Sequence, residues 1–70
     1  MRAEFYDDDN DKIYDLPDIC LIEQSENGII YHMCNEYNIR KATYVLKNRK
    51  LSKVGDINFA ICEINEVIIK

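Results

Sequence analysis

The chain has 70 residues, with 9 Lys or Arg against 13 Asp or Glu, and its formal net charge is −4. A chain this short buries only about 60% of its unfolded surface, so we expect one small domain over residues 1–70 and no multi-part catalytic machinery. No stretch approaches the roughly 20 apolar residues of a membrane span, and the acidic N-terminal residues do not resemble a signal peptide. These features predict a cytoplasmic protein without a membrane partner.

The three cysteines, Cys20, Cys34 and Cys62, form an odd number and contain no close pair. That pattern is not a disulfide framework of the secreted kind, because such frameworks use even numbers of cysteines at short spacings. We therefore expect buried, reduced thiols that pack as small apolar side chains.

The N-terminal third is predicted to be a short strand followed by an exposed acidic segment. Residues 2–6 are strand-like, whereas residues 7–12 are too charged and too poor in apolar residues to form anything but a turn or loop. Pro17 marks a boundary, because the residue before a proline is excluded from the helical region. The exposed acidic segment is thus expected over about residues 7–18.

Residues 19–34 fit two different structures. An Asn27-Gly28 step separates two runs rich in β-branched and aromatic residues, which is a strong hairpin signal. Alternatively, Pro17 begins a helix that a Gly28 cap ends, and a second helix starts near Ile29. The sequence leaves residues 29–34 open between strand and helix.

The rest of the chain is predicted to contain the main helix and a terminal hairpin. Between about residues 35 and 50, Tyr37, Ala42, Val45 and Leu46 fit the apolar face of an amphipathic helix. Apolar residues alternate with small or polar ones from Ile57 onward, which favours a β-hairpin over 57–70. The expected fold class is α+β, with antiparallel hairpins packed on one or two helices.

Charge is distributed unevenly along the chain. Residues 1–26 contain nine acids and two bases, whereas residues 27–70 contain seven bases and four acids. Six bases occur between positions 40 and 53, where there is no acid: Arg40, Lys41, Lys47, Arg49, Lys50 and Lys53. The acidic segment could bind a basic protein and the basic segment nucleic acid, or the two segments could simply fold against each other.

Two metal-ligand patterns are incomplete in this sequence. The spacing of a calcium loop is present, but the position that requires glycine is occupied by Lys12. The oxygen ligands would be Asp7, Asp9, Asp11, Ile13, Asp15 and Asp18. A zinc site from His32 and the three cysteines lacks the usual close ligand pairs. We expect no metal site, no cofactor and no enzymatic activity, because a glycine-rich phosphate loop is also missing.

A helix-turn-helix pattern is present only in part. With Ile39 after the turn, Met33 and Tyr44 occupy apolar positions of the pattern, but Lys47 stands where another apolar residue is required. Direct nucleic-acid binding by a small transcription regulator, through the six bases of residues 40–53, is therefore the alternative function.

The acidic residues suggest a second kind of partner. In an extended backbone the carboxylates of Asp7, Asp9 and Asp11 would lie about 6.6 Å apart, close to every second phosphate step of a DNA strand. Aromatic residues beside the row, Phe5, Tyr6 and Tyr14, would serve as anchors. The predicted partner-binding residues are these three aromatic residues together with seven acids: Asp7, Asp8, Asp9, Asp11, Asp15, Asp18 and Glu23.

In size, acidity, the Asp7–Asp11 cluster and its Ile, Asn, Lys and Asp usage, the chain resembles small acidic bacteriophage proteins that disable host factors. Some of these are DNA mimics that block HU-type nucleoid proteins or DNA-processing enzymes. The resemblance implies a non-enzymatic inhibitor that binds a basic DNA-binding protein in the host cytoplasm, and it assigns no individual residue. The basic run over residues 40–53 departs from that pattern, and it would lie away from the binding face or contact the acidic half of a second copy in a homodimer.

Overall fold

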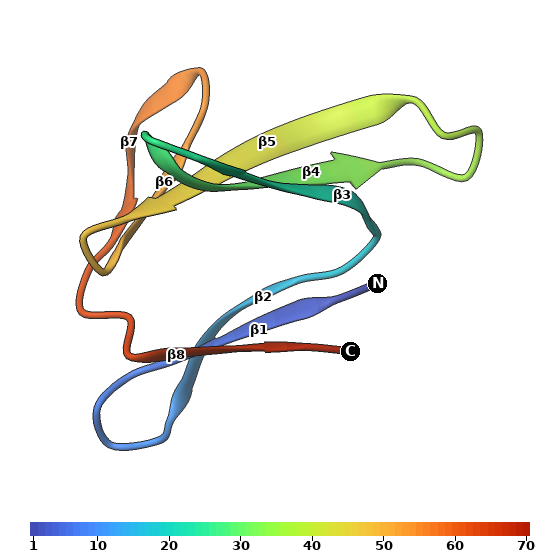
Figure 1. Ribbon diagram of the computed structural model, residues 1–70. Coiled ribbons are helices and arrows are strands. Elements are labelled where there is room, and N and C mark those ends of the chain that lie inside the picture. The colour runs from blue at the N-terminus through green and yellow to red at the C-terminus, as the bar shows by residue number, and fades with distance from the viewer.

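The computed structural model describes residues 1–70 as an all-β protein with two antiparallel sheets and no helix (Figure 1). The strands are β1 (Ala3–Tyr6), β2 (Lys12–Leu16), β3 (Ile19–Ser25), β4 (Gly28–Cys34), β5 (Arg40–Lys47), β6 (Lys50–Lys53), β7 (Asp56–Ile61) and β8 (Glu66–Ile69). One sheet has the order β2-β1-β8, and the other has the order β3-β4-β5-β6-β7. The chain contains no helix able to cross a membrane.

The core lies where the two sheets face each other. Phe5 of β1 is fully buried, and its ring meets that of Tyr31 on β4 edge to face, with centroids 5.3 Å apart. A second aromatic cluster joins Tyr14 of β2 to Tyr44 and Phe59 of the larger sheet. Aromatic side chains from both sheets therefore hold the layers together.

The predicted helix over residues 35–50 is wrong, and with it the α+β fold class and the helix-turn-helix pattern. Residues 40–53 form the β5–β6 hairpin instead. Ala42, Tyr44 and Leu46 occur at every second position and pack on or in the core, as the periodicity of a strand requires. Ala42 and Leu46 are also four positions apart, which fits the periodicity of a helix. Asn48 and Arg49 both have positive φ, at 52° and 65°, and they make the two-residue turn that reverses the chain.

The predicted hairpin over residues 19–34 is confirmed as β3 and β4, and the helical alternative is wrong. The turn itself lies at Glu26 and Asn27, one residue earlier than the Asn27-Gly28 step. Gly28 follows it with φ of +110°, and a Cβ there would collide with the backbone oxygen of Leu46 on β5. The glycine is therefore required by both its backbone angle and the close approach of the neighbouring strand.

The strand over residues 2–6 is confirmed, but the predicted hairpin over 57–70 is wrong. Strand β7 pairs with β6, whereas β8 leaves that sheet and pairs with β1. Between them Ile64 is buried in the core, and Glu63 has a φ of 63°. Burying Ile64 turns the chain from one sheet to the other, a long-range effect that local alternation does not reveal.

The expectation of buried, reduced thiols is also wrong. Cys20 and Cys34 are joined by a disulfide with a Cα–Cα distance of 5.8 Å, and Cys62 is a free, exposed thiol. The β3–β4 pairing brings the two residues together across a separation of 14 positions. Because the two sulfurs are bonded to each other, they are not available as zinc ligands.

Candidate functional site

The loop between β1 and β2 holds three aspartates in a fixed turn. The Asp7 Oδ1 atom accepts hydrogen bonds from the backbone N–H of Asp9 at 2.9 Å and of Asp11 at 3.0 Å. The Asp7 N–H donates to the carbonyl of Asp11, and Asn10 adopts a left-handed conformation with φ of 63°. Asparagine tolerates this conformation, so the loop closes without a glycine.

The loop between β4 and β5 is built in the same way without the charge. Asn35 Oδ1 accepts from the N–H of Tyr37 at 2.9 Å and of Ile39 at 3.0 Å. The Asn35 N–H donates to the carbonyl of Ile39, and Asn38 has φ of 61°. An amide oxygen thus supports the same turn as the carboxylate of Asp7, and the charge of the first loop is separable from its shape.

The carboxylates of the first loop lie close together. Oxygen atoms of Asp7, Asp9 and Asp11 are within 4.8 Å of one another, and none of the three residues has a basic partner in the molecule. The spacing of about 6.6 Å expected for an extended backbone is not realised, because the segment turns. The six positions of the calcium-loop pattern do not come together either, because the carboxylate of Asp18 forms an ion pair with Lys41.

Two glutamates that sequence reasoning missed lie beside this loop. Glu66 pairs with Tyr6 at the end of β1, and the N–H of Asn65 donates to the Tyr6 carbonyl at 2.8 Å. Glu63 and Glu66 are exposed and have no basic partner. More than 50 residues separate them from the loop. The β1–β8 pairing places Glu66 beside it. Glu63 precedes Ile64, whose carbonyl binds the same Arg49 guanidinium as Asp8. We call this set the acidic end: Asp7, Asp8, Asp9, Asp11, Glu63 and Glu66.

One base is built into the acidic end. The Arg49 guanidinium donates to Asp8 Oδ1 at 2.7 Å and to the carbonyl of Ile64 at 3.1 Å. Arg49 comes from the turn between β5 and β6, so its contact with Asp8 ties the larger sheet to the β1–β2 loop. Asp8 is therefore neutralised locally, whereas the other five acids of the acidic end are not.

The remaining predicted acids have partners inside the molecule. Asp15 lies 3.5 Å from Arg2, and Glu23 Oε1 lies 2.6 Å from His32 Nε2. The hydrogen bond from Lys41 lowers the pKa of Asp18. The acidic segment is thus no continuous row of free charge, and part of it folds against the basic segment, through the contacts of Asp8 and Asp18.

The three predicted aromatic anchors are largely used internally. Phe5 is buried in the core, and the Tyr6 hydroxyl donates to Glu4 at 2.9 Å. Contact with the Tyr44 hydroxyl, together with burial, raises the pKa of Tyr14 to about 12. Tyr6 and Tyr14 are both half-buried, and Tyr6 is the one that stands directly before the acidic loop.

Outside the acidic end, β1 carries a buried carboxylate that binds two lysines. Glu4 is 5% exposed and receives Lys70 at 2.9 Å and Lys12 at 3.3 Å. These bonds, with the one from the Tyr6 hydroxyl, lower the pKa of Glu4 to about 2, and the bond from Lys70 is the largest cause. The cluster joins all three strands of the smaller sheet.

The predicted basic residues are divided between the two ends of β5. Lys47 and Lys50 stand directly opposite each other in the β5–β6 pair, and Lys53 lies over the Tyr44 ring, 5.7 Å from its centroid. Arg40 is exposed at the other end of β5. Lys41 and Arg49 are held by Asp18 and Asp8. Four of the six bases are therefore free to meet an anion.

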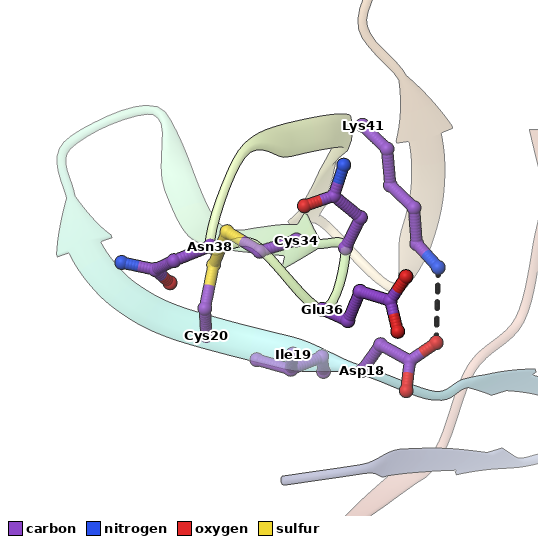
Figure 2. Close-up of a pocket in the computed structure, with 8 residues that line it drawn as sticks. Asp18, Ile19, Cys20, Cys34, Glu36, Asn38 and Lys41 are labelled. Carbon is purple, nitrogen blue, oxygen red and sulfur yellow. Dashed lines mark hydrogen bonds and ion pairs between the residues drawn. A yellow bond between two sulfur atoms is a disulfide. The ribbon is translucent and has the colours of Figure 1, made fainter.

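The disulfide lies at a hollowed corner, where β3 begins and β4 ends (Figure 2). A cavity of about 510 Å³ is lined by Cys20 and Cys34 together with Asp18 and Lys41, whose ion pair bridges its rim. A second cavity of about 330 Å³ shares both cysteines and includes Arg40. Comparison with protein-family models, curated proteins and solved structures finds no match to this chain.

Proposed function

We propose that the protein is a non-enzymatic inhibitor that binds a basic, nucleic-acid-binding protein through its acidic end. The observation that supports this most directly is the group of three carboxylates at Asp7, Asp9 and Asp11, which no internal base neutralises. Concentrated charge of one sign steers a partner of opposite charge and raises the association rate. The locked loop adds to affinity, because little backbone freedom remains to be lost on binding.

Such an inhibitor competes with nucleic acid for the same basic surface. The carboxylates replace phosphates as counterions of the partner, so the competition weakens as salt concentration rises. An HU-type nucleoid protein is a suitable probe, because its DNA-binding surface is basic and the resemblance to phage inhibitors points to that class. Glu63 and Glu66 extend the surface beyond the loop itself.

The test is displacement of labelled duplex DNA from an HU-type protein, followed by fluorescence anisotropy. The informative variant replaces Asp7, Asp9 and Asp11 by Asn, because the loop of Asn35 keeps its shape with an amide oxygen. A matched control removes three charges elsewhere on the surface, with Glu26→Gln, Glu36→Gln and Asp56→Asn. We expect the loop variant to need about tenfold more protein for displacement, equivalent to about 1.4 kcal/mol, and the control to behave like the original chain.

Two outcomes would contradict the proposal. One is equal displacement by the loop variant and the control, which would mean that only overall charge matters. The other is failure of the original chain to displace DNA from any basic probe at low salt. In both cases the acidic end would be reduced to a solubilising surface.

A second candidate function is direct nucleic-acid binding by a small regulator. It is favoured by the Lys47–Lys50 pair, since like charges placed directly opposite each other in a sheet are destabilising and are relieved by an anion. Arg40 and Lys53 would extend that surface. Under this function the protein alone binds duplex DNA in a salt-sensitive manner, and Lys47→Gln with Lys50→Gln abolishes the binding.

A further inference from the structure

The Cys20–Cys34 disulfide differs from a buried structural bridge in its surroundings. Cys20 is an exposed residue, and both cysteines line the two cavities of about 510 and 330 Å³ at this corner. Figure 2 shows the disulfide on one side of the lining residues and the Lys41–Asp18 ion pair on the other. A small molecule therefore has access to the bond from solvent.

The two sulfurs are not equivalent. Strand β3 is an edge strand of the larger sheet, whereas β4 lies between β3 and β5. Met1 pairs with Ile19 on the outer edge of β3, but Cys20 itself is exposed, whereas Cys34 is half-buried between β3 and β5. A thiolate attacks a disulfide along the line of the S–S bond, so the sulfur of the exposed Cys20 is the more accessible target and the half-buried Cys34 is the less accessible one.

The leaving sulfur also has a suitable neighbour. Cys34 and Arg40 are partners in the β4–β5 pairing, and both line the smaller cavity. A cation beside a cysteine stabilises its thiolate form and makes it a better leaving group. The acids at this corner are Asp18, which is held by Lys41, and Glu36, which lines only the larger cavity.

Both cysteines lie at irregularities of the sheet. The β3–β4 register shifts between Ile19 and Leu21, which leaves Cys20 without a partner, and the β4–β5 register shifts between Met33 and Cys34. Bulges of this kind re-aim side chains and occur often beside reactive sites. Here they place the disulfide at the rim of the sheet.

We propose that this disulfide is a site of exchange with small-molecule thiols, in which Cys20 takes up the thiol and Cys34 is the leaving group. The incoming thiolate forms a new S–S bond to Cys20 Sγ while the Cys20–Cys34 bond breaks. The electron pair of the broken bond goes to Cys34 Sγ, which departs as a thiolate beside Arg40. A second thiol can then attack the bound thiol's sulfur, which leaves both cysteines reduced and releases an oxidised thiol dimer.

The test uses the folded protein with Cys62→Ser, which removes the free exposed thiol and its side reactions. The protein is incubated with reduced glutathione, quenched with an alkylating reagent and analysed by peptide mass spectrometry, while circular dichroism confirms that the fold persists. We expect glutathione on Cys20 and the alkyl group on Cys34. Arg40→Gln should slow the reaction about threefold, because the leaving thiolate loses its cation, and Lys47→Gln should leave the rate unchanged.

Three results would overturn the proposal. The first is reaction only after unfolding in denaturant, which would make the bridge purely structural. The second is glutathione found mainly on Cys34, and the third is an equal rate for the Arg40→Gln and Lys47→Gln variants.

Discussion

The three-stranded sheet joins the first and last strands of the chain, whereas the five-stranded sheet is a continuous run of hairpins from β3 to β7. The smaller sheet depends on contacts between distant residues, including the bond of buried Glu4 to Lys70, which the nearer Lys12 reinforces. The larger sheet relies on tight turns and on the disulfide between its first two strands. The comparison shows that one small protein stabilises its two layers by different means, which substitutions can separate.

The largest effect is expected where the two sheets meet. Phe5→Ala removes a fully buried ring that packs on Tyr31, and deletions of this kind cost about 3–5 kcal/mol. In a chain this short such a loss unfolds most of the population. Urea unfolding at neutral pH measures it, with Ile57→Ala as the control because Ile57 is 99% exposed. Equal midpoints for the two variants would show that the sheets do not depend on each other.

Removing the disulfide should weaken the larger sheet. A bridge across a separation of 14 residues restricts the unfolded chain, and a loop of that size corresponds to about 3 kcal/mol. We expect Cys20→Ser with Cys34→Ser to lower the free energy of unfolding by up to that amount. Amide exchange should quicken in β3 and β4 before it does in β1 and β8. Uniform acceleration in both sheets would remove the distinction drawn between them.

Acid should act first on the smaller sheet. The pKa of Glu4 is about 2 in the folded protein, against an ordinary value of 4.5, because its carboxylate is held by Lys70, Tyr6 and Lys12. A lowered pKa means that the stabilisation is complete above about pH 4.5 and is lost as the pH falls towards 2. Glu4→Gln should flatten this part of the stability profile in urea titrations between pH 5 and 2. An unchanged slope would place the acid sensitivity elsewhere.

The smallest effect is expected at the surface contact between the sheets. The Arg49–Asp8 pair is exposed on both sides, and exposed pairs contribute about 0.2–1 kcal/mol. A double-mutant cycle with Asp8→Asn and Arg49→Gln isolates the coupling, which should shrink as salt is added. A coupling well above 1 kcal/mol at high salt would mean that Arg49 is an essential clamp between the layers.

The sequence predicted those elements whose signals are local. The strand over residues 2–6, the turn that follows it and the hairpin around Gly28 depend on neighbouring residues and are confirmed. The exposed acidic segment predicted over residues 7–18 is shorter than expected, because Lys12–Leu16 form β2 and Leu16 is buried. The prediction of a helix over residues 35–50 is wrong because Ala42 and Leu46 fit helical spacing as well as the strand alternation that they follow. The β1–β8 pairing follows from long-range packing, which no local pattern carries, whereas the Cys20–Cys34 bond closes across the β3–β4 hairpin that the sequence did predict.

The same reasoning applies to the candidate site. Asp7, Asp9 and Asp11 were identified from their clustering alone, and the structure leaves them without internal basic partners. Asp18 and Glu23 looked equivalent in sequence, but Lys41 and His32 approach them only once the sheets form. Glu63 and Glu66 join the acidic end for the same long-range reason.

The pairing of β1 with β8 also has a consequence for the order of folding. Arg2 and Lys70 exchange backbone hydrogen bonds at 2.9 and 2.8 Å, so β1 pairs with a strand at least 60 positions further along the chain. Closing so long a loop is entropically costly and slow compared with closing a hairpin. We expect the hairpins of β3 to β7 to form first during refolding, and β1 to acquire its second neighbour, β8, in a later step.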